Sequence, residues 1–147
     1  MGEFSEIAVN NFKQGYNCAQ SVFLAYAKHF NIEEDTALKL SSSFGAGMGR
    51  LREVCGAVSS MFAIAGLSKG YTDPLDDDAK AKHYELIQRL SKIFIEKHET
   101  IICRELLGLP EGADEPIPSK RTEEYYQERP CENFIRTASE IIEKELL

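Results

Sequence analysis

The chain has 147 residues, a formal net charge of −7 and 43% hydrophobic residues. One domain of this length buries a sufficient core without disulfide staples, and the composition excludes wholesale disorder. The negative charge argues against a protein that binds the phosphate backbone of nucleic acids, because such proteins need a basic patch. We therefore expect no nucleic-acid partner.

The sequence shows no sign of membrane insertion or export. Its longest apolar stretches, such as residues 63–67, are far too short to span a bilayer. Residues 1–4 lack the basic start and apolar run of a signal peptide. We therefore expect a cytoplasmic protein. Stable structural disulfides are rare in that compartment, so the cysteines need another explanation.

Helical periodicity recurs along the chain, whereas strand signals are weak. The pattern predicts helices over residues 3–14, 18–30, 36–40, 57–67, 78–99, 103–107 and from 131 to the end. In the last of these we expect an inward face made of Phe134, Ile135, Ala138, Ile141 and Ile142. The simplest architecture is all-α, an irregular helical bundle that forms a single domain over residues 1–147.

Two segments are predicted to be loops. Residues 109–119 carry three prolines and one glycine. The other loop contains Gly45, Gly47 and Gly49, which do not form a dinucleotide fingerprint. Either these glycines adopt positive φ angles, or their backbone N–H groups approach a sulfur anion or a bound ligand. In the second interpretation Gly45, Gly47, Gly49 and Arg50 bind a cofactor.

The four cysteines contain no C-x-x-C pair, and a lone cysteine is often only a small buried apolar residue. However, each falls at a predicted helix start. They are Cys18, Cys55, Cys103 and Cys131. A helix N-terminus presents free N–H groups and partial positive charge, which stabilise the thiolate over the thiol. We therefore predict that the four cysteines converge in one functional thiol site.

Cys55 is expected to be the most reactive of these thiols. It follows Arg50 and Arg52 and opens a buried helix. We expect the two arginines and the helix dipole to lower the pKa of Cys55 more than burial raises it.

Several blocks then occur in a familiar order, at residues 17–20, 44–50, 55–57, 103–108 and 129–131. This order resembles the "putative redox-active protein" family, named for a Cys, then Cys-Gly-Ala-x-x-Gly, then two more Cys. The resemblance covers nearly the whole chain and implies a redox role. Its members are linked to transporter genes, which implies a redox partner or a transporter component as partner. Ser60 stands where the motif has glycine, and we expect it to loosen a close helix contact.

Three functions stay open at this point. In the first, a thiol-based oxidoreductase, Cys55 attacks and another of the four cysteines resolves. In the second, all four thiolates (Cys18, Cys55, Cys103 and Cys131) hold an iron–sulfur cluster or zinc. In the third, the chain is a structural or partner-binding helical protein with incidental cysteines.

Overall fold

The computed structural model describes residues 2–147, and that range contains helices but no strand or sheet, so the predicted all-α fold is confirmed. The elements are α1 (Glu3–Lys13), α2 (Cys18–Ala27), the 3-10 turn η1 (Lys28–Phe30), α3 (Glu34–Ser42), α4 (Gly45–Met48), α5 (Gly56–Lys69), α6 (Asp77–His98), α7 (Cys103–Leu107), α8 (Glu123–Glu128) and α9 (Cys131–Leu146). No helix among residues 2–147 is long and apolar enough to cross a membrane.

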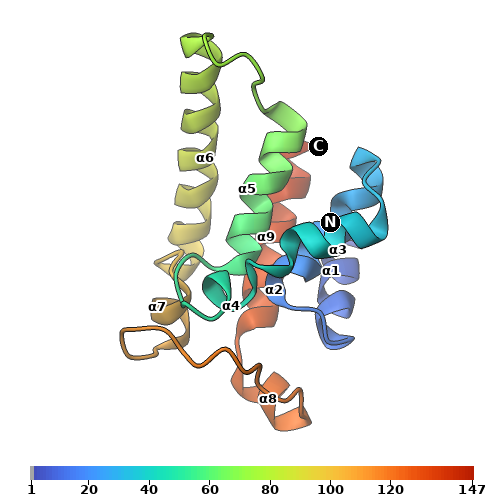
Figure 1. The fold of residues 1–147 in the computed structure, drawn as a ribbon, viewed down its shortest axis with the longest axis vertical. Coiled ribbons are helices and arrows are strands. Elements are labelled where there is room, and N and C mark those ends of the chain that lie inside the picture. The colour runs from blue at the N-terminus through green and yellow to red at the C-terminus, as the bar shows by residue number, and fades with distance from the viewer. Residues whose placement is uncertain (1) are drawn as a thin grey trace.

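Helices α5 and α9 run side by side through the centre of the molecule (Figure 1). The long helix α6 covers one flank of this pair, whereas α1, α2 and α3 lie on the other flank. At the C-terminal ends of the pair, the hydroxyl of Ser68 donates to the carbonyl oxygen of Leu146 at 3.0 Å. The two helices are therefore parallel, and their N-termini lie together at the opposite end of the bundle.

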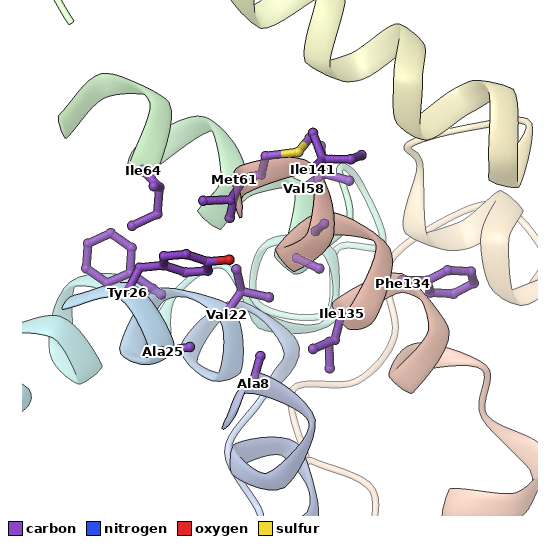
Figure 2. Packing of buried hydrophobic residues seen from close by; sticks show 14 of the residues in the cluster. Ala8, Val22, Ala25, Tyr26, Val58, Met61, Ile64, Phe134, Ile135 and Ile141 are labelled. Atoms are coloured by element: carbon purple, nitrogen blue, oxygen red, sulfur yellow. The ribbon is translucent and has the colours of Figure 1, made fainter. Parts of the chain in front are cut away.

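The core is formed where the apolar faces of α1, α2, α5, α6 and α9 meet (Figure 2). Its fully buried side chains include Val22, Tyr26, Val58, Met61, Ile64, Leu90, Phe94, Ile135 and Ile142. Burying one such aliphatic or aromatic side chain contributes about 1.5–3 kcal/mol. The only polar atom of Tyr26 is satisfied inside this core, because its hydroxyl donates to the carbonyl oxygen of Ser139 at 2.6 Å. The face predicted for the last helix is buried as expected.

Some boundaries differ from the prediction, for local reasons. The helix expected over 18–30 ends at Ala27, and the following turn stops at Asn31, whose φ of 59° is left-handed. The third helix includes the acidic residues Glu34 and Asp35 in its first turn, where they complement the helix dipole. The sequence also gave no prediction of α8, which begins where the hydroxyl of Thr122 accepts the backbone N–H of Tyr125.

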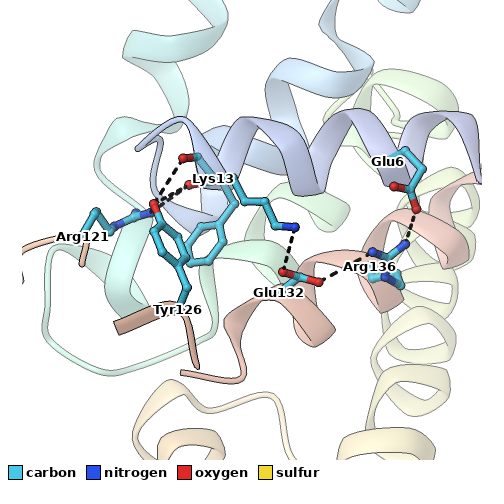
Figure 3. Close-up of polar contacts among 7 residues, drawn as sticks. Glu6, Lys13, Arg121, Tyr126, Glu132 and Arg136 are labelled. Atoms are coloured by element: carbon cyan, nitrogen blue, oxygen red, sulfur yellow. Dashed lines mark hydrogen bonds and ion pairs between the residues drawn. The ribbon is translucent and has the colours of Figure 1, made fainter. Parts of the chain in front are cut away.

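Polar contacts attach the end of α1 to the segments before and within α9 (Figure 3). Arg121 donates to the carbonyl oxygens of Phe12 and Tyr16, both at 2.9 Å, and its guanidinium lies 4.4 Å from the centre of the Phe12 ring. The exposed pair of Arg136 with Glu6 adds little, since surface ion pairs are typically worth about 0–1 kcal/mol. Arg121 is therefore the main link between α1 and the chain that precedes α8.

The first turns of α2 and α5 are in direct contact. A Cβ atom on Gly56 would lie 2.6 Å from Cys18 Sγ and 2.7 Å from the carbonyl oxygen of Phe44, so only glycine fits there. One turn later the buried hydroxyl of Ser60 donates to the carbonyl oxygen of Ala19 at 2.6 Å. Ser60, which we expected to loosen this contact, thus forms a hydrogen bond between the two helices.

Gly56→Ala is expected to lower the free energy of unfolding by about 1–3 kcal/mol, because the added methyl group overpacks the α2–α5 contact. Gly66→Ala is the matched control on the same helix, because a Cβ there meets nothing within 4 Å. It should change stability by between zero and a gain of about 1 kcal/mol, the helix propensity difference. Urea unfolding followed by circular dichroism measures both, and equal effects would contradict the close contact at Gly56.

Candidate functional site

All four cysteines line one cavity of about 180 Å³ at the end of the bundle where the helices start. Cys18, Cys103 and Cys131 are the first residues of α2, α7 and α9, and Cys55 is the N-cap of α5. The structure therefore brings together the four residues that the sequence predicted to converge. All four thiols are free.

Backbone pairing between two distant segments brings Cys55 and Cys103 to the same place. Val54 and Ile102 form an isolated antiparallel bridge. Around it, the N–H of Cys55 donates to the carbonyl oxygen of Ile101 at 2.8 Å, and the N–H of Cys103 donates to that of Glu53 at 2.6 Å. The bridge fixes the start of α7 beside the start of α5.

Asn17 positions Cys18 by capping α2. Its side-chain oxygen accepts a hydrogen bond from the backbone N–H of Gln20 at 2.9 Å. The backbone N–H of Asn17 in turn donates to the side-chain oxygen of Gln20, which completes a capping box. The side-chain amide nitrogen of Asn17 also donates to the carbonyl oxygen of Ser42 at 3.1 Å. A Cβ on Gly45 would overlap this side chain, so the glycine lets the loop close over the start of α2.

The loop that contains Gly45, Gly47 and Gly49 has the expected positive φ angles and also lies close to the cysteines. Positive φ angles occur at Gly47 and Gly49, and they extend to Ala46, Met48 and Arg50. A left-handed conformation costs a non-glycine residue roughly 1–2 kcal/mol. The loop lies directly against Cys103. A Cβ on Gly47 would be only 2.7 Å from the Cβ of Cys103, so a side chain does not fit at this position. Gly45 and Arg50 line the cavity, whereas Gly49 is exposed, and a cofactor-binding role for these residues stays a prediction.

The expectation for Cys55 is not met. Burial raises the pKa of the Cys55 thiol well above its ordinary value, and the neighbouring Cys18 raises it further. The backbone N–H groups of Val58 and Ala57 act in the opposite direction but do not compensate. Cys55 is only 5% exposed, so loss of hydration outweighs the helix dipole at this position.

Arg52 contacts a different thiol from the one expected. Its Nη1 donates to Cys103 Sγ at 3.5 Å, and its Nε donates to Asp114 Oδ2 at 2.8 Å. Although burial alone lowers the pKa of the guanidinium, these two bonds raise it above its ordinary value, so Arg52 stays charged. Cys103 is therefore the thiol that this buried, cationic side chain contacts directly.

Arg50 and Arg52 also hold the loop of residues 109–119 against the cavity. Arg50 Nε donates to the carbonyl oxygen of Glu115 at 2.6 Å, and both arginines pair with Asp114. The N–H of Asp114 in turn donates to the carbonyl oxygen of Arg50 at 2.9 Å. No sequence pattern pointed to Asp114, because its partners lie more than sixty residues earlier in the chain.

Cys131 and Cys18 line the same cavity, and burial acts on both of their thiols. Burial raises the pKa of Cys131 to about 12, and the neighbouring Cys18 and Cys103 add to this effect. Burial also raises the pKa of Cys18, against the backbone N–H group of Ala46. Both groups are therefore neutral thiols at pH 7.

The family model described as "Putative redox-active protein (C_GCAxxG_C_C)" matches residues 16–145. The chain belongs to this family. The match includes all four cysteines, the glycine loop and Arg52, and of the residues that line the cavity only Phe12 lies outside it. No curated protein and no solved structure matched the chain.

The cysteines do not lie in an arrangement that matches a metal centre. In the part of the chain that the structure describes, no three His, Cys, Asp or Glu side chains are grouped closely enough to hold a metal ion. Zinc and iron–sulfur clusters are normally held by four ligands in contact with the metal. The four-thiolate ligand set of this redox-active family member thus stays a prediction from its sequence.

Alkylation of the reduced protein at pH 7 is expected to label Cys103 faster than Cys55, because Arg52 contacts the Cys103 sulfur and burial keeps Cys55 protonated. Arg52→Gln should slow labelling of Cys103 about tenfold, whereas Arg52→Lys, which keeps a charge, should slow it less. Peptide mass spectrometry gives the rate at each cysteine. Faster labelling of Cys55 than of Cys103 would reverse this assignment.

Asp114→Asn is expected to remove an acid-sensitive contribution to stability. The hydrogen bond from Arg52 holds the pKa of Asp114 below its ordinary value of 3.8. The ionised carboxylate therefore stabilises the fold above that value, and the contribution is lost as the pH falls through the lowered pKa. Urea midpoints of wild type and variant should differ at pH 7, begin to converge as the pH falls below about 4, and coincide once the pH is below the lowered pKa of Asp114. Glu111→Gln, at an exposed position of the same loop, is the control that should show no such convergence.

Proposed function

We propose that the chain is a thiol–disulfide redox protein in which Cys103 attacks a disulfide and Cys131 resolves the product. The observation that carries this proposal is the convergence of four free thiols on one cavity, with Arg52 in contact with Cys103 Sγ. The family description supports a redox role but names no reaction. Thiol–disulfide exchange needs an attacking thiolate and a second thiol within reach of it, and no other group.

The chemistry takes place in two steps. The Cys103 thiolate attacks one sulfur of a substrate disulfide, whose S–S bond breaks, and the departing thiolate takes up a proton. Cys131 then attacks Cys103 Sγ, which breaks the mixed disulfide, and its proton passes to the second departing thiolate. The substrate gains two electrons and two protons. The protein supplies both electrons and the Cys131 proton as it forms a Cys103–Cys131 disulfide, and the other proton comes from water, to which the Cys103 thiol lost its own proton beforehand.

The different surroundings of the thiols support these roles. Cys131 shares the cavity with Cys103, and burial, which raises its pKa to about 12, keeps it protonated at pH 7. Cys18 is instead packed against Gly56, between two helix starts. Cys18 and Cys55 remain as alternative resolving thiols, and Cys55 is the more deeply buried of the two.

The test uses reduced, anaerobically purified protein and the uncharged hydroxyethyl disulfide. Wild type should form one intramolecular disulfide, Cys103→Ser should lose the reaction at least about a hundredfold, and Cys131→Ser should accumulate the mixed disulfide at Cys103. Mass spectrometry identifies each product, and circular dichroism confirms that each variant is folded. Wild-type activity in Cys103→Ser, or tightly bound iron or zinc that withdraws the thiols, would contradict the proposal.

A further inference from the structure

The cavity is positively charged although the chain as a whole is negative. Among the residues whose side chains the structure describes, four arginines line the cavity and no aspartate or glutamate does. These are Arg50, Arg52, Arg121 and Arg129. The whole chain has 24 acidic and 17 basic residues, so a random set of lining residues would contain more acidic than basic members. The distribution of charge points to a ligand of opposite sign.

The partners of these arginines do not cancel their charge. One carboxylate, Asp114, pairs with both Arg50 and Arg52. Arg121 bonds to backbone carbonyl oxygens, which are neutral. Arg129 lies 5.6 Å from the centre of the Tyr125 ring and has no ion pair with a side chain that the structure describes. The planar guanidinium has five N–H donors, so each of these arginines keeps donors free for a further acceptor.

The thiols and the tyrosine hydroxyl that line the cavity do not supply negative charge to balance the arginines either. Burial raises the pKa of Cys18, of Cys55 and of Cys131, so these thiols are neutral at pH 7. Burial likewise raises the pKa of Tyr125. Even with Cys103 as a thiolate, the arginines exceed the carboxylate and the thiolate together by two charges.

The remaining walls are apolar and the space is small. Phe12, Leu106, Leu107 and Phe134 line the cavity beside the arginines. A volume of about 180 Å³ is less than that of most drug-sized ligand sites, which range over about 300–1,000 Å³. The cavity therefore suits a small molecule with a short apolar body and an anionic end, and charge recognition is strengthened by the low dielectric of its walls.

We propose that the cavity binds a low-molecular-weight disulfide that bears carboxylates, with a carboxylate at Arg129 and Arg50 and the S–S bond toward Cys103. This inference rests on the proposed redox function for the reaction but not for the binding of the anion. Arginine is suited to this recognition because its fork of donors matches a carboxylate in two-point contact.

The experiment compares three disulfides of similar size at low salt: dithiodipropionate, which is anionic, the uncharged hydroxyethyl disulfide and the cationic cystamine. Each rate is divided by that of the urea-unfolded protein, which removes intrinsic reactivity. The folded protein should prefer the anion to the cation by at least about tenfold, and added salt should reduce the preference. Arg129→Gln should reduce it several-fold. Arg89→Gln, at an exposed arginine on α6, is the matched charge control and should not.

The outcomes separate the two proposals. Equal rates for the three disulfides, or the same preference in Arg129→Gln as in wild type, would overturn the anion site and leave the redox function standing. If no disulfide reacts, binding of thiodipropionate, an unreactive thioether with the same two carboxylates, is measured by NMR. Binding that is weakened by Arg129→Gln but not by Arg89→Gln then supports the anion site without the redox function, and absence of binding overturns both.

Discussion

The close approach of the first turns of α2 and α5 is the constraint on which the cavity depends. Four helices point their N-termini at one place, and the partial positive charges of these ends repel one another. The backbone N–H groups of Gly56 and Ala19, at two of these helix starts, both act on Cys18 and oppose the rise in its pKa that burial causes. Gly56 makes the arrangement possible, because its missing side chain lets Cys18 lie against the start of α5.

Burial and charge then divide four chemically identical thiols into two kinds. Cys55 and Cys131 are held as neutral thiols, because removing a sulfur from water penalises the charged form. Cys103 is also buried, at 7% exposed, but it has the guanidinium of Arg52 in contact. A difference of this kind between neighbouring thiols is what an exchange reaction requires, since one must attack while the other waits.

The fold was predictable from the sequence where local interactions decide it. Periodicity identified the long helices, and the capping residue Asn17 together with Pro130 located the cysteines at helix starts. The contacts of Arg52 were not predictable, because its proximity to Cys55 in the sequence suggested the wrong thiol. Its true partner is chosen by the Val54–Ile102 bridge, which joins segments that carry no strand pattern. Asp114 was missed for the same reason, since nothing local distinguishes it from other loop carboxylates.

The four cysteines are far apart in the sequence, so their oxidation to a disulfide would stabilise the fold. Each cysteine belongs to a different helix, so any disulfide within the cavity would cross-link segments that are distant in sequence. Closing loops of several tens of residues removes entropy from the unfolded chain and is worth about 3–5 kcal/mol. The oxidation state of the four cysteines would therefore set how long the protein survives proteolysis. The form with a disulfide would survive longer than the reduced form.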